Sequence, residues 1–329
     1  MMRIAILGFG SVGRGIARVL LAKDLGIAVT GLADSKSGII DAGGIDLAAA
    51  LARKEGGGPC GNPGVSPADV VAKAEYDVLV EVTPTNVETG EPALGHIREA
   101  LRRHKHVVTS NKGPIALDYP GLRALAEANG VLLKYEATVC GAIPLIHAMQ
   151  EGLAGNTISR LYGVFNGTCN YILTRMAAEG LTYEQALAEA RDLGYAEADP
   201  TYDVEGIDAG IKLVILANTI LDLSTTLDDV ERTGITLLSP EALQLAEDQD
   251  CTIRLIGEII PNAGVLRVSP RIIPKTHPLV VEGTLNAVTV EADLAGDLTF
   301  IGKGAGSTET ASAVIGDLLY IRERYVKGS

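Results

Sequence analysis

The sequence predicts an α/β protein with two domains. Up to about residue 136, short apolar runs alternate with helical patterns, which is typical of a parallel sheet built from strand–helix–strand units. From residue 252 several strands follow one another, which indicates a second, α+β domain. The length of 329 residues also fits two domains, because one domain takes about 150 residues.

The first element is a strand at residues 3–7, and a glycine turn joins it to a helix at residues 14–21. The turn has the pattern Gly-x-Gly-x-x-Gly, whose glycines allow a tight turn and a close approach of the backbone to a ligand. The N-terminus of the helix then offers its N–H groups to a pyrophosphate. We therefore expect a Rossmann-type domain whose dinucleotide contacts Gly8, Phe9, Gly10, Ser11, Val12 and Gly13.

Asp34 follows the second predicted strand, residues 28–33, and lies 21 residues after Gly13. An acidic residue at this position binds the 2′-hydroxyl of the adenosine ribose, which favours NAD. Ser35 and Lys36 come next and could accept a 2′-phosphate instead. The choice between NAD and NADP therefore stays open.

Two further strands, residues 76–82 and 106–110, end in polar residues. Ligands of parallel sheets bind beyond the carboxyl ends of the strands. We therefore expect Thr83, Ser110 and Lys112 to contact the cofactor, with Lys112 as a second candidate for a catalytic lysine. The alternative for Lys112 is an exposed lysine in the loop 111–114. Helices are predicted at 88–104 and 122–129, and one more strand at 131–135.

A loop of small residues, 137–144, opens the second domain. Asn166 precedes a helix at 169–178, and Thr182 with Gln185 forms a capping box at the start of the next helix. Ser239 starts one more helix. Strands are predicted at 159–165, 252–260, 265–273 and 288–294. A sheet this open predicts a homodimer.

Asp208 and Lys212 stand four residues apart in the stretch that runs from a loop at 203 into an apolar helix. This spacing places them on one helix face, and the ordinary interpretation is a surface ion pair. The neighbouring residues from 207 to 221 are nearly all apolar, however, which predicts a buried helix. A buried lysine needs a partner or a function. We therefore predict that Lys212 is an acid/base in a cleft, held by Asp208.

The C-terminal part contains a strand at 298–301, a glycine-rich loop at 302–307 and a helix. We expect this segment to return to the first domain and complete the cofactor site, the alternative being a flexible linker. The expected domains are a dinucleotide-binding domain 1–136, a catalytic and dimerisation domain 137–298, and a returning segment 299–329.

The composition argues against nucleic acid and membranes as partners. The net charge is −13, and the chain has no Trp and only 3 Phe. No apolar run reaches the roughly 18 residues of a membrane-spanning helix. The four cysteines contain no Cys-x-x-Cys pair, which fits a reducing, cytoplasmic location.

Taken together, these motifs resemble homoserine dehydrogenase, in the same order and over nearly the whole chain. The matching stretches are Leu7-Gly-Phe-Gly-Ser-Val-Gly13, Thr109-Ser-Asn-Lys-Gly113, Tyr135-Glu-Ala-Thr-Val139, Asn166-Gly-Thr-Cys-Asn-Tyr-Ile-Leu173, Gly194-Tyr-Ala-Glu-Ala-Asp-Pro200, Asp203-Val-Glu-Gly-Ile-Asp-Ala-Gly-Ile-Lys212 and Gly304-Ala-Gly-Ser-Thr-Glu-Thr-Ala311. The resemblance implies NAD(P)-dependent interconversion of L-homoserine and L-aspartate 4-semialdehyde, a step toward threonine, isoleucine and methionine.

The resemblance also implies roles for residues. Lys212 matches the acid/base, and Lys112 matches a lysine beside the reacting centre. Glu197 and Asp208 match residues that hold homoserine, with Asp203 as a further substrate residue or a support for the others. Gly194 and Gly304 are expected at the cofactor. A sodium site is implied at Glu136, Val139, Gly141 and Ile143.

Two departures from the family pattern stand out. Many members carry a C-terminal ACT domain that senses threonine, and we expect none here. Cys140 and Cys169 stand where small residues or Thr are expected. The alternative functions are a related Rossmann dehydrogenase acting on another amino-acid-derived alcohol or aldehyde, and a non-catalytic dinucleotide-sensing protein.

Overall fold

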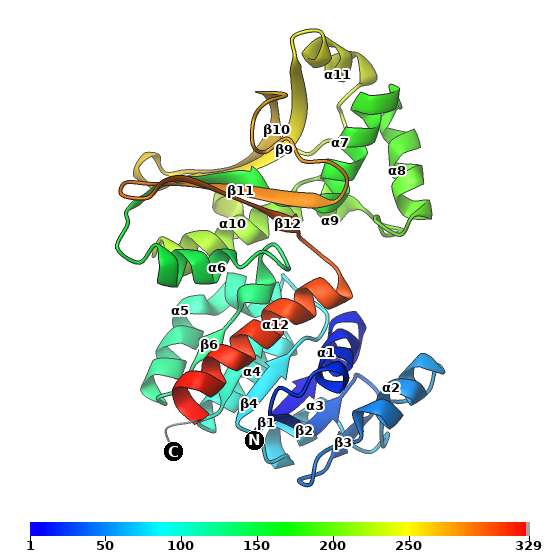
Figure 1. The fold of residues 1–329 in the computed structure, drawn as a ribbon, viewed down its shortest axis with the longest axis vertical. Coiled ribbons are helices and arrows are strands. Elements are labelled where there is room, and N and C mark those ends of the chain that lie inside the picture. The colour runs from blue at the N-terminus through cyan, green and yellow to red at the C-terminus, as the bar shows by residue number, and fades with distance from the viewer. Residues whose placement is uncertain (327–329) are drawn as a thin grey trace. The chain divides into compact units, whose positions relative to one another are not determined.

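The computed structural model describes residues 1–326. The chain forms two compact units (Figure 1). The nucleotide-binding unit comprises residues 1–142 and the segment from Gly306 onward. The second unit comprises residues 143–305. We describe each unit by itself.

The nucleotide-binding unit contains one six-stranded sheet in the order β3-β2-β1-β4-β5-β6. Its neighbouring strands are parallel except for β3, which pairs antiparallel with β2. The predicted parallel sheet is therefore confirmed. The strands are β1 (Met2–Leu7), β2 (Ile27–Ala33), β3 (Gly38–Ile40), β4 (Val78–Glu81), β5 (His106–Thr109) and β6 (Leu133–Lys134).

The C-terminal helix packs against the first helix of this unit. The helix α12 lies along α1 (Figure 1), so closely that a Cβ atom on Gly15 would collide with the main chain of Ser307. The Ser307 hydroxyl also donates to the carbonyl of Ser11 at 2.6 Å. The predicted return of the C-terminal helix is thus confirmed. The α-helices are α1 (Ser11–Ala22), α2 (Leu47–Glu55), α3 (Pro67–Lys73), α4 (Ala93–Arg102), α5 (Lys112–Ala128) and α12 (Ser307–Ile321), with short helices η1 (Glu136–Thr138) and η5 (Arg322–Val326).

The second unit contains a six-stranded sheet in the order β12-β11-β7-β9-β10-β8. Neighbours are antiparallel except for the short pair of β8 with β10. The strands are β7 (Ile158–Val164), β8 (Glu231–Arg232), β9 (Cys251–Ile260), β10 (Val265–Pro274), β11 (Leu285–Ala292) and β12 (Gly296–Lys303).

One expectation about the C-terminal segment is wrong. The strand predicted at 298–301 does not return with the last helix, because it is part of β12 and pairs with β11 along its whole length. The two strands form a hairpin, and the Thr289 and Thr299 hydroxyls lie 2.8 Å apart across it. Cross-strand contacts of this kind stabilise such pairing. The chain passes to the nucleotide-binding unit only at Gly306, directly before α12.

The buried helix at the centre of the second unit is α10 (Ile207–Ile220), in which every residue from Asp208 to Thr219 is buried. It covers the sheet face to which Gly257 belongs, where a Cβ atom would press on Leu213 and Phe165. The other helices are α6 (Leu145–His147), η2 (Ala148–Gly152), α7 (Gly167–Glu179), α8 (Tyr183–Asp192), α9 (Thr201–Val204), η3 (Leu227–Asp229), α11 (Pro240–Glu247) and η4 (Pro261–Ala263).

The predicted helix caps are present in the structure. The Asn166 side chain accepts from the main-chain N–H of Cys169, and Thr182 and Gln185 form the reciprocal capping box of α8. Ser239 caps α11. Within residues 1–326, no helix is long and apolar enough to cross a membrane.

Candidate active site

The glycine turn after β1 can be formed only by glycine at two of its positions. Gly8 has φ +99°, and a Cβ atom there would overlap the carbonyl of Val82 at the end of β4. A Cβ atom on Gly13 would overlap the carbonyl of Gly8. Gly10, in contrast, faces open space. The turn is thus packed tightly on its inner side and open on its outer side, as close approach of a pyrophosphate requires.

The start of α1 leaves its N–H groups available. Gly10 is the cap residue, and within the described chain no side chain caps this end of the helix. The first helical residues are Ser11 and Val12, while the Phe9 side chain is buried in the core and contributes only its backbone to the turn. Uncapped N–H groups at a helix N-terminus favour an anionic ligand. This end of the unit therefore fits a dinucleotide.

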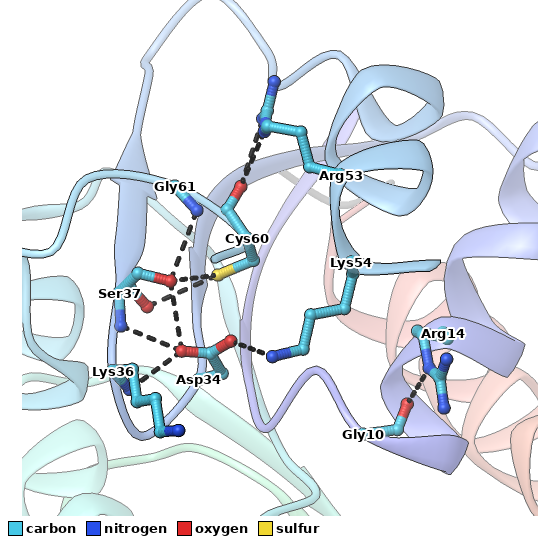
Figure 2. A network of polar contacts seen from close by, with 9 residues as sticks. All are labelled: Gly10, Arg14, Asp34, Lys36, Ser37, Arg53, Lys54, Cys60 and Gly61. Carbon is cyan, nitrogen blue, oxygen red and sulfur yellow. Dashed lines mark hydrogen bonds and ion pairs between the residues drawn. The ribbon is translucent and has the colours of Figure 1, made fainter. Parts of the chain in front are cut away.

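Asp34 directly follows β2 and is the centre of a polar network (Figure 2). Its Oδ1 accepts from the main-chain N–H groups of Lys36 and Ser37, both at 2.8 Å, and from the Ser37 hydroxyl at 3.1 Å. Its Oδ2 lies 2.6 Å from Nζ of Lys54 in α2. Burial by itself raises the pKa of Asp34, but these bonds outweigh it and hold the pKa below its ordinary value.

Cys60 supports the same network from the glycine-rich loop 56–64 (Figure 2). Its thiol lies 3.2 Å from the Ser37 hydroxyl, and its carbonyl accepts from the guanidinium of Arg53. Burial raises the pKa of this thiol, so Cys60 acts as a structural residue rather than a nucleophile. The carboxylate of Asp34 is therefore held rigidly and already bears a cationic partner.

Lys112 does not lie in a loop, so the alternative of an exposed loop lysine is wrong. It is the first residue of α5, because the Asn111 side chain caps this helix by accepting from Gly113 N at 3.1 Å. The Asn111 amide also donates to the Thr83 carbonyl at 3.1 Å. The structure thus brings Thr83 and the segment from Ser110 to Lys112 together at the carboxyl ends of β4 and β5.

Lys212 and Asp208 form a buried pair in the second unit. Lys212 Nζ lies 2.6 Å from Asp208 Oδ2, and the two residues are only 6% and 5% exposed. Lys212 also donates to the Phe165 carbonyl at 2.6 Å. The interpretation as a surface ion pair is therefore wrong. A carboxylate and a carbonyl fix the direction of the ammonium group.

Asn166 joins this pair to Asp203, a role that the sequence pattern did not reveal. Its Nδ2 donates to Asp203 Oδ1 at 2.6 Å and to Asp208 Oδ2 at 2.9 Å, while its Oδ1 caps α7. Burial, and next the negative charge of Asp208, raise the pKa of Asp203. The sequence contained one signal for Asn166, its place in the Asn166-Gly-Thr168 helix start, but only the fold shows what its amide contacts.

Asn286 of β11 is a second residue that sequence reasoning missed. Its Nδ2 donates to the Phe165 carbonyl at 2.9 Å, the same oxygen that receives the bond from Lys212. A Cβ atom on Gly304 would overlap the Asn286 side chain. Gly304, a predicted cofactor residue, therefore packs directly against Asn286. The Asn286 amide in turn holds the Phe165 carbonyl to which Lys212 donates.

Glu197 and Gly194 are the two predicted site residues between α8 and α9. Both are exposed in the segment between α8 and α9, and Gly194 has φ +74°. Within residues 1–326, Glu197 forms no hydrogen bond or ion pair with the Lys212 cluster. The role of Glu197 therefore stays a prediction.

The segment of the implied sodium site has an unusual backbone. Cys140 and Gly141 are both left-handed, with φ 57° and 52°. Glu136 is only 3% exposed, and its N–H donates to Asp317 at 3.0 Å. In the described chain no three His, Cys, Asp or Glu side chains form a metal-binding group, so such an ion would depend on backbone oxygens.

Comparison with known proteins first gives the class. Residues 8–136 match the family model described as homoserine dehydrogenase, NAD binding domain, which agrees with the glycine turn and makes the chain an NAD(P)-dependent oxidoreductase. Residues 144–319 match the model described as homoserine dehydrogenase. The chain belongs to the homoserine dehydrogenase family.

Individual relatives agree over nearly full length. The chain is 47% identical to the homoserine dehydrogenase of Methanocaldococcus jannaschii, covering 97% of this chain and 98% of the relative. It is 49% identical to a putative homoserine dehydrogenase of Archaeoglobus fulgidus, with a TM-score of 0.92 and coverage of 98% and 99%. A hyperthermophilic archaeal homoserine dehydrogenase in complex with NADPH is 31% identical, with a TM-score of 0.85 and 98% of each chain covered. The resemblance seen in the motifs is confirmed.

Proposed function

We propose that this homoserine dehydrogenase interconverts L-homoserine and L-aspartate 4-semialdehyde with Lys212 as the acid/base. The observation that carries the proposal is the buried pair of Lys212 with Asp208. Burying two charges is costly, and a hydrophobic pair would give a helix of comparable stability. A function for the lysine explains why the pair is present.

The nicotinamide supplies or accepts the hydride when it is bound. Lys212 then handles the proton of the substrate oxygen. In the reducing direction its ammonium stabilises the developing alkoxide and donates a proton, and in the oxidising direction the neutral amine accepts the alcohol proton. Because the Asp208 carboxylate and the Phe165 carbonyl both hold Nζ, proton transfer takes place at a fixed position.

Carboxylates of the second unit suit the ammonium group of the substrate. We assign Asp208 and Glu197 to this role, since charge-assisted hydrogen bonds are the strong ones. Asp203 supports these two carboxylates, because the Asn166 amide contacts both Asp203 and Asp208. The raised pKa of Asp203 also means that its carboxyl group ionises less readily. We also assign a catalytic role to Lys112, because the stretch from Thr109 to Gly113 resembles the family motif whose lysine lies beside the reacting centre.

Initial rates test the reaction and the cofactor together. We expect oxidation of NADH, NADPH or both on addition of L-aspartate 4-semialdehyde. A panel of other amino-acid-derived aldehydes separates this proposal from a related dehydrogenase, and turnover of a different aldehyde with none of aspartate semialdehyde would contradict it. Dinucleotide binding without any turnover would indicate a sensing protein.

A sodium ion held by the segment from Glu136 to Ile143 is part of the proposal. The two left-handed residues turn the chain sharply, which fits a loop whose carbonyls of Glu136, Val139, Gly141 and Ile143 face one ion. We expect thermal stability to rise when sodium replaces a bulky organic cation at constant ionic strength. An unchanged melting temperature contradicts the site.

We also propose that the enzyme is a homodimer in the cytoplasm. On the sheet face opposite α10, Glu258 accepts hydrogen bonds from Arg160, Arg267 and Arg271, three arginines whose side chains remain 32–41% exposed. These partly exposed charges on a broad sheet could pair with the same face of a second copy of the chain. Light scattering at micromolar concentration checks the dimer, and a monomer would disprove it.

The proposed cytoplasmic location agrees with four reduced cysteines.

A further inference from the structure

Glu81, the last residue of β4, links residues that we expect at the cofactor. Its carboxylate Oε1 accepts a hydrogen bond from the Thr83 hydroxyl. Its main-chain carbonyl accepts from the N–H of Ser110 at 3.2 Å and from the Thr109 hydroxyl at 2.9 Å. One residue thus contacts both polar strand ends, although none of the sequence motifs singles it out.

The burial of Glu81 requires an explanation. Its side chain is fully buried, and Oε2 has no hydrogen-bond partner among residues 1–326. The imidazole of His96 in α4 stands 3.7 Å from Oε1, beyond hydrogen-bond distance. A buried carboxylate with an unsatisfied oxygen destabilises the fold, so a role in the site accounts for it better than stability does.

The contact with Glu81 determines what the Thr83 hydroxyl can do. A hydroxyl has one proton to donate and two lone pairs that accept. The carboxylate takes the proton, and Asn111 Nδ2 approaches the same oxygen at 3.4 Å as a donor. Thr83 is only half-buried. Toward a ligand its hydroxyl can therefore act only as an acceptor.

The position of Thr83 in the sheet indicates which part of the dinucleotide it meets. The pyrophosphate turn follows β1, and Asp34 on the adenosine side follows β2. Since β4 neighbours β1 on the opposite side from β2, the other half of the dinucleotide extends over the end of β4. That half carries the nicotinamide carboxamide and a ribose, both of which have donors.

We propose that Glu81 is a positioning residue that holds the Thr83 hydroxyl as a hydrogen-bond acceptor for the nicotinamide half of the cofactor. The donor is either the carboxamide N–H or a ribose hydroxyl. The inference rests on dinucleotide binding and not on which alcohol is oxidised. Glu81 itself need not touch the cofactor.

Binding measurements test the proposal without turnover. The dissociation constant of NADPH, followed by nicotinamide fluorescence, is measured for Glu81→Met, Thr83→Val and the double variant. We expect each single change to weaken binding about five- to tenfold, as loss of one hydrogen bond does. The double variant should bind no more weakly than Thr83→Val, because both changes remove the same contact. Glu81→Gln keeps an acceptor oxygen and should recover most of the affinity.

A cofactor analogue distinguishes the two donors. In the 3-acetylpyridine analogue an acetyl group replaces the carboxamide and has no N–H. If the carboxamide is the donor, Thr83→Val no longer weakens binding of this analogue; if the ribose is the donor, the loss persists. Either result supports a contact at Thr83.

Three results would overturn the proposal. They are multiplicative losses in the double variant, an unchanged NADPH affinity in folded Glu81→Met, and equal losses in Thr83→Ser and Thr83→Val. The last comparison keeps the test decisive if Glu81→Met fails to fold, since Ser retains the hydroxyl. Wild-type protein that binds NADPH but does not oxidise homoserine would contradict the proposed function and leave this inference standing.

Discussion

Lys212 and Asp208 face each other one turn apart on α10, 2.6 Å between Nζ and Oδ2, and both are buried. The same unit contains a lysine–carboxylate contact of the ordinary kind, Lys275 with Glu247, whose side chains are 41% and 42% exposed. Exposed pairs contribute about 0–1 kcal/mol, whereas breaking a buried pair costs about 3–5 kcal/mol. The two lysines therefore form a matched comparison.

Lys212→Met should abolish most of the activity. Loss of a general acid/base lowers kcat by about 10²–10⁴. The measurement is kcat in both directions together with the melting temperature, because Asp208 is left buried without its ammonium partner. Lys275→Met should leave kcat unchanged. A Lys212→Met enzyme that is folded and retains near wild-type kcat would rule out the acid/base role.

The Lys212 pair could be predicted from sequence because both residues lie on one continuous helix, where spacing determines the face and apolar neighbours indicate burial. The glycine turn could be predicted for the same reason, since strand, turn and helix are consecutive. Asn286 could not, because it reaches the Phe165 carbonyl from a strand 121 residues away. Glu81 looks like an ordinary strand-end residue until β5 lies beside it.

Asn166→Asp should impair the enzyme more than Asn166→Ala. Both changes remove the amide that donates to Asp203 and Asp208, but the aspartate adds a third carboxylate beside two others. We expect activity to fall at least about tenfold for Ala and further for Asp, because like charges in a buried site repel.

A capping control separates stability from function in this series. Asn166 also caps α7, and losing a cap costs about 1 kcal/mol. Ser239→Ala removes only the cap of α11 and should cost a similar free energy of unfolding with no loss of kcat. Equal losses of activity in Ser239→Ala and Asn166→Ala would mean that the hydrogen bonds from Asn166 to Asp203 and Asp208 do not contribute to activity.

The prediction succeeded for elements that a local sequence pattern determines. It failed for the strand at 298–301, whose place in the fold depends on a tertiary contact. The Asn166, Thr182 and Ser239 caps are local signals, and all three start helices. The strand at 298–301 is equally local, but its partner is not, and pairing with β11 decides to which unit it belongs. The short β3 and the helices α2 and α3 lacked a pattern strong enough to predict.

Asp203 should make stability depend on pH with a particular sign. Burial and the charge of Asp208 raise its pKa above the ordinary 3.8. Between the unfolded and the folded value, the folded protein binds more protons than the unfolded chain, so stability falls as pH rises through this window. Asp203→Asn cannot titrate and should remove that fall, which urea unfolding at several values between about pH 4 and 7 measures.

Asp199 provides a control of the opposite sign. Hydrogen bonds from Thr201 lower its pKa, so its contribution is present above the unfolded value and is lost as pH falls through the folded one. Asp199→Asn should therefore flatten the acid limb only. If Asp203→Asn leaves the pH dependence of stability as in wild type, the carboxyl of Asp203 is not held in the way we describe.

Lys54→Met should shift cofactor preference toward NADH. We expect the carboxylate of Asp34 at the adenosine ribose, and Lys54 Nζ lies 2.6 Å from it and offsets its charge (Figure 2). With Lys54 present, the position tolerates a 2′-phosphate; without it, the Asp34 charge repels the phosphate and is available to accept from the ribose hydroxyls of NADH. We expect the dissociation constant of NADPH to rise about tenfold, or 1.4 kcal/mol, with little change for NADH.

The control for this prediction is Lys73→Met, which removes an exposed lysine paired with Asp69 in α3 of the same unit. It should change neither affinity. The salt dependence adds a second measurement, because a charge contact with the 2′-phosphate is screened by salt. NADPH binding should therefore weaken with salt more steeply in the wild type than in Lys54→Met. If NADPH and NADH lose affinity equally in Lys54→Met, Lys54 only supports the fold of the Asp34 network and does not discriminate between the two cofactors.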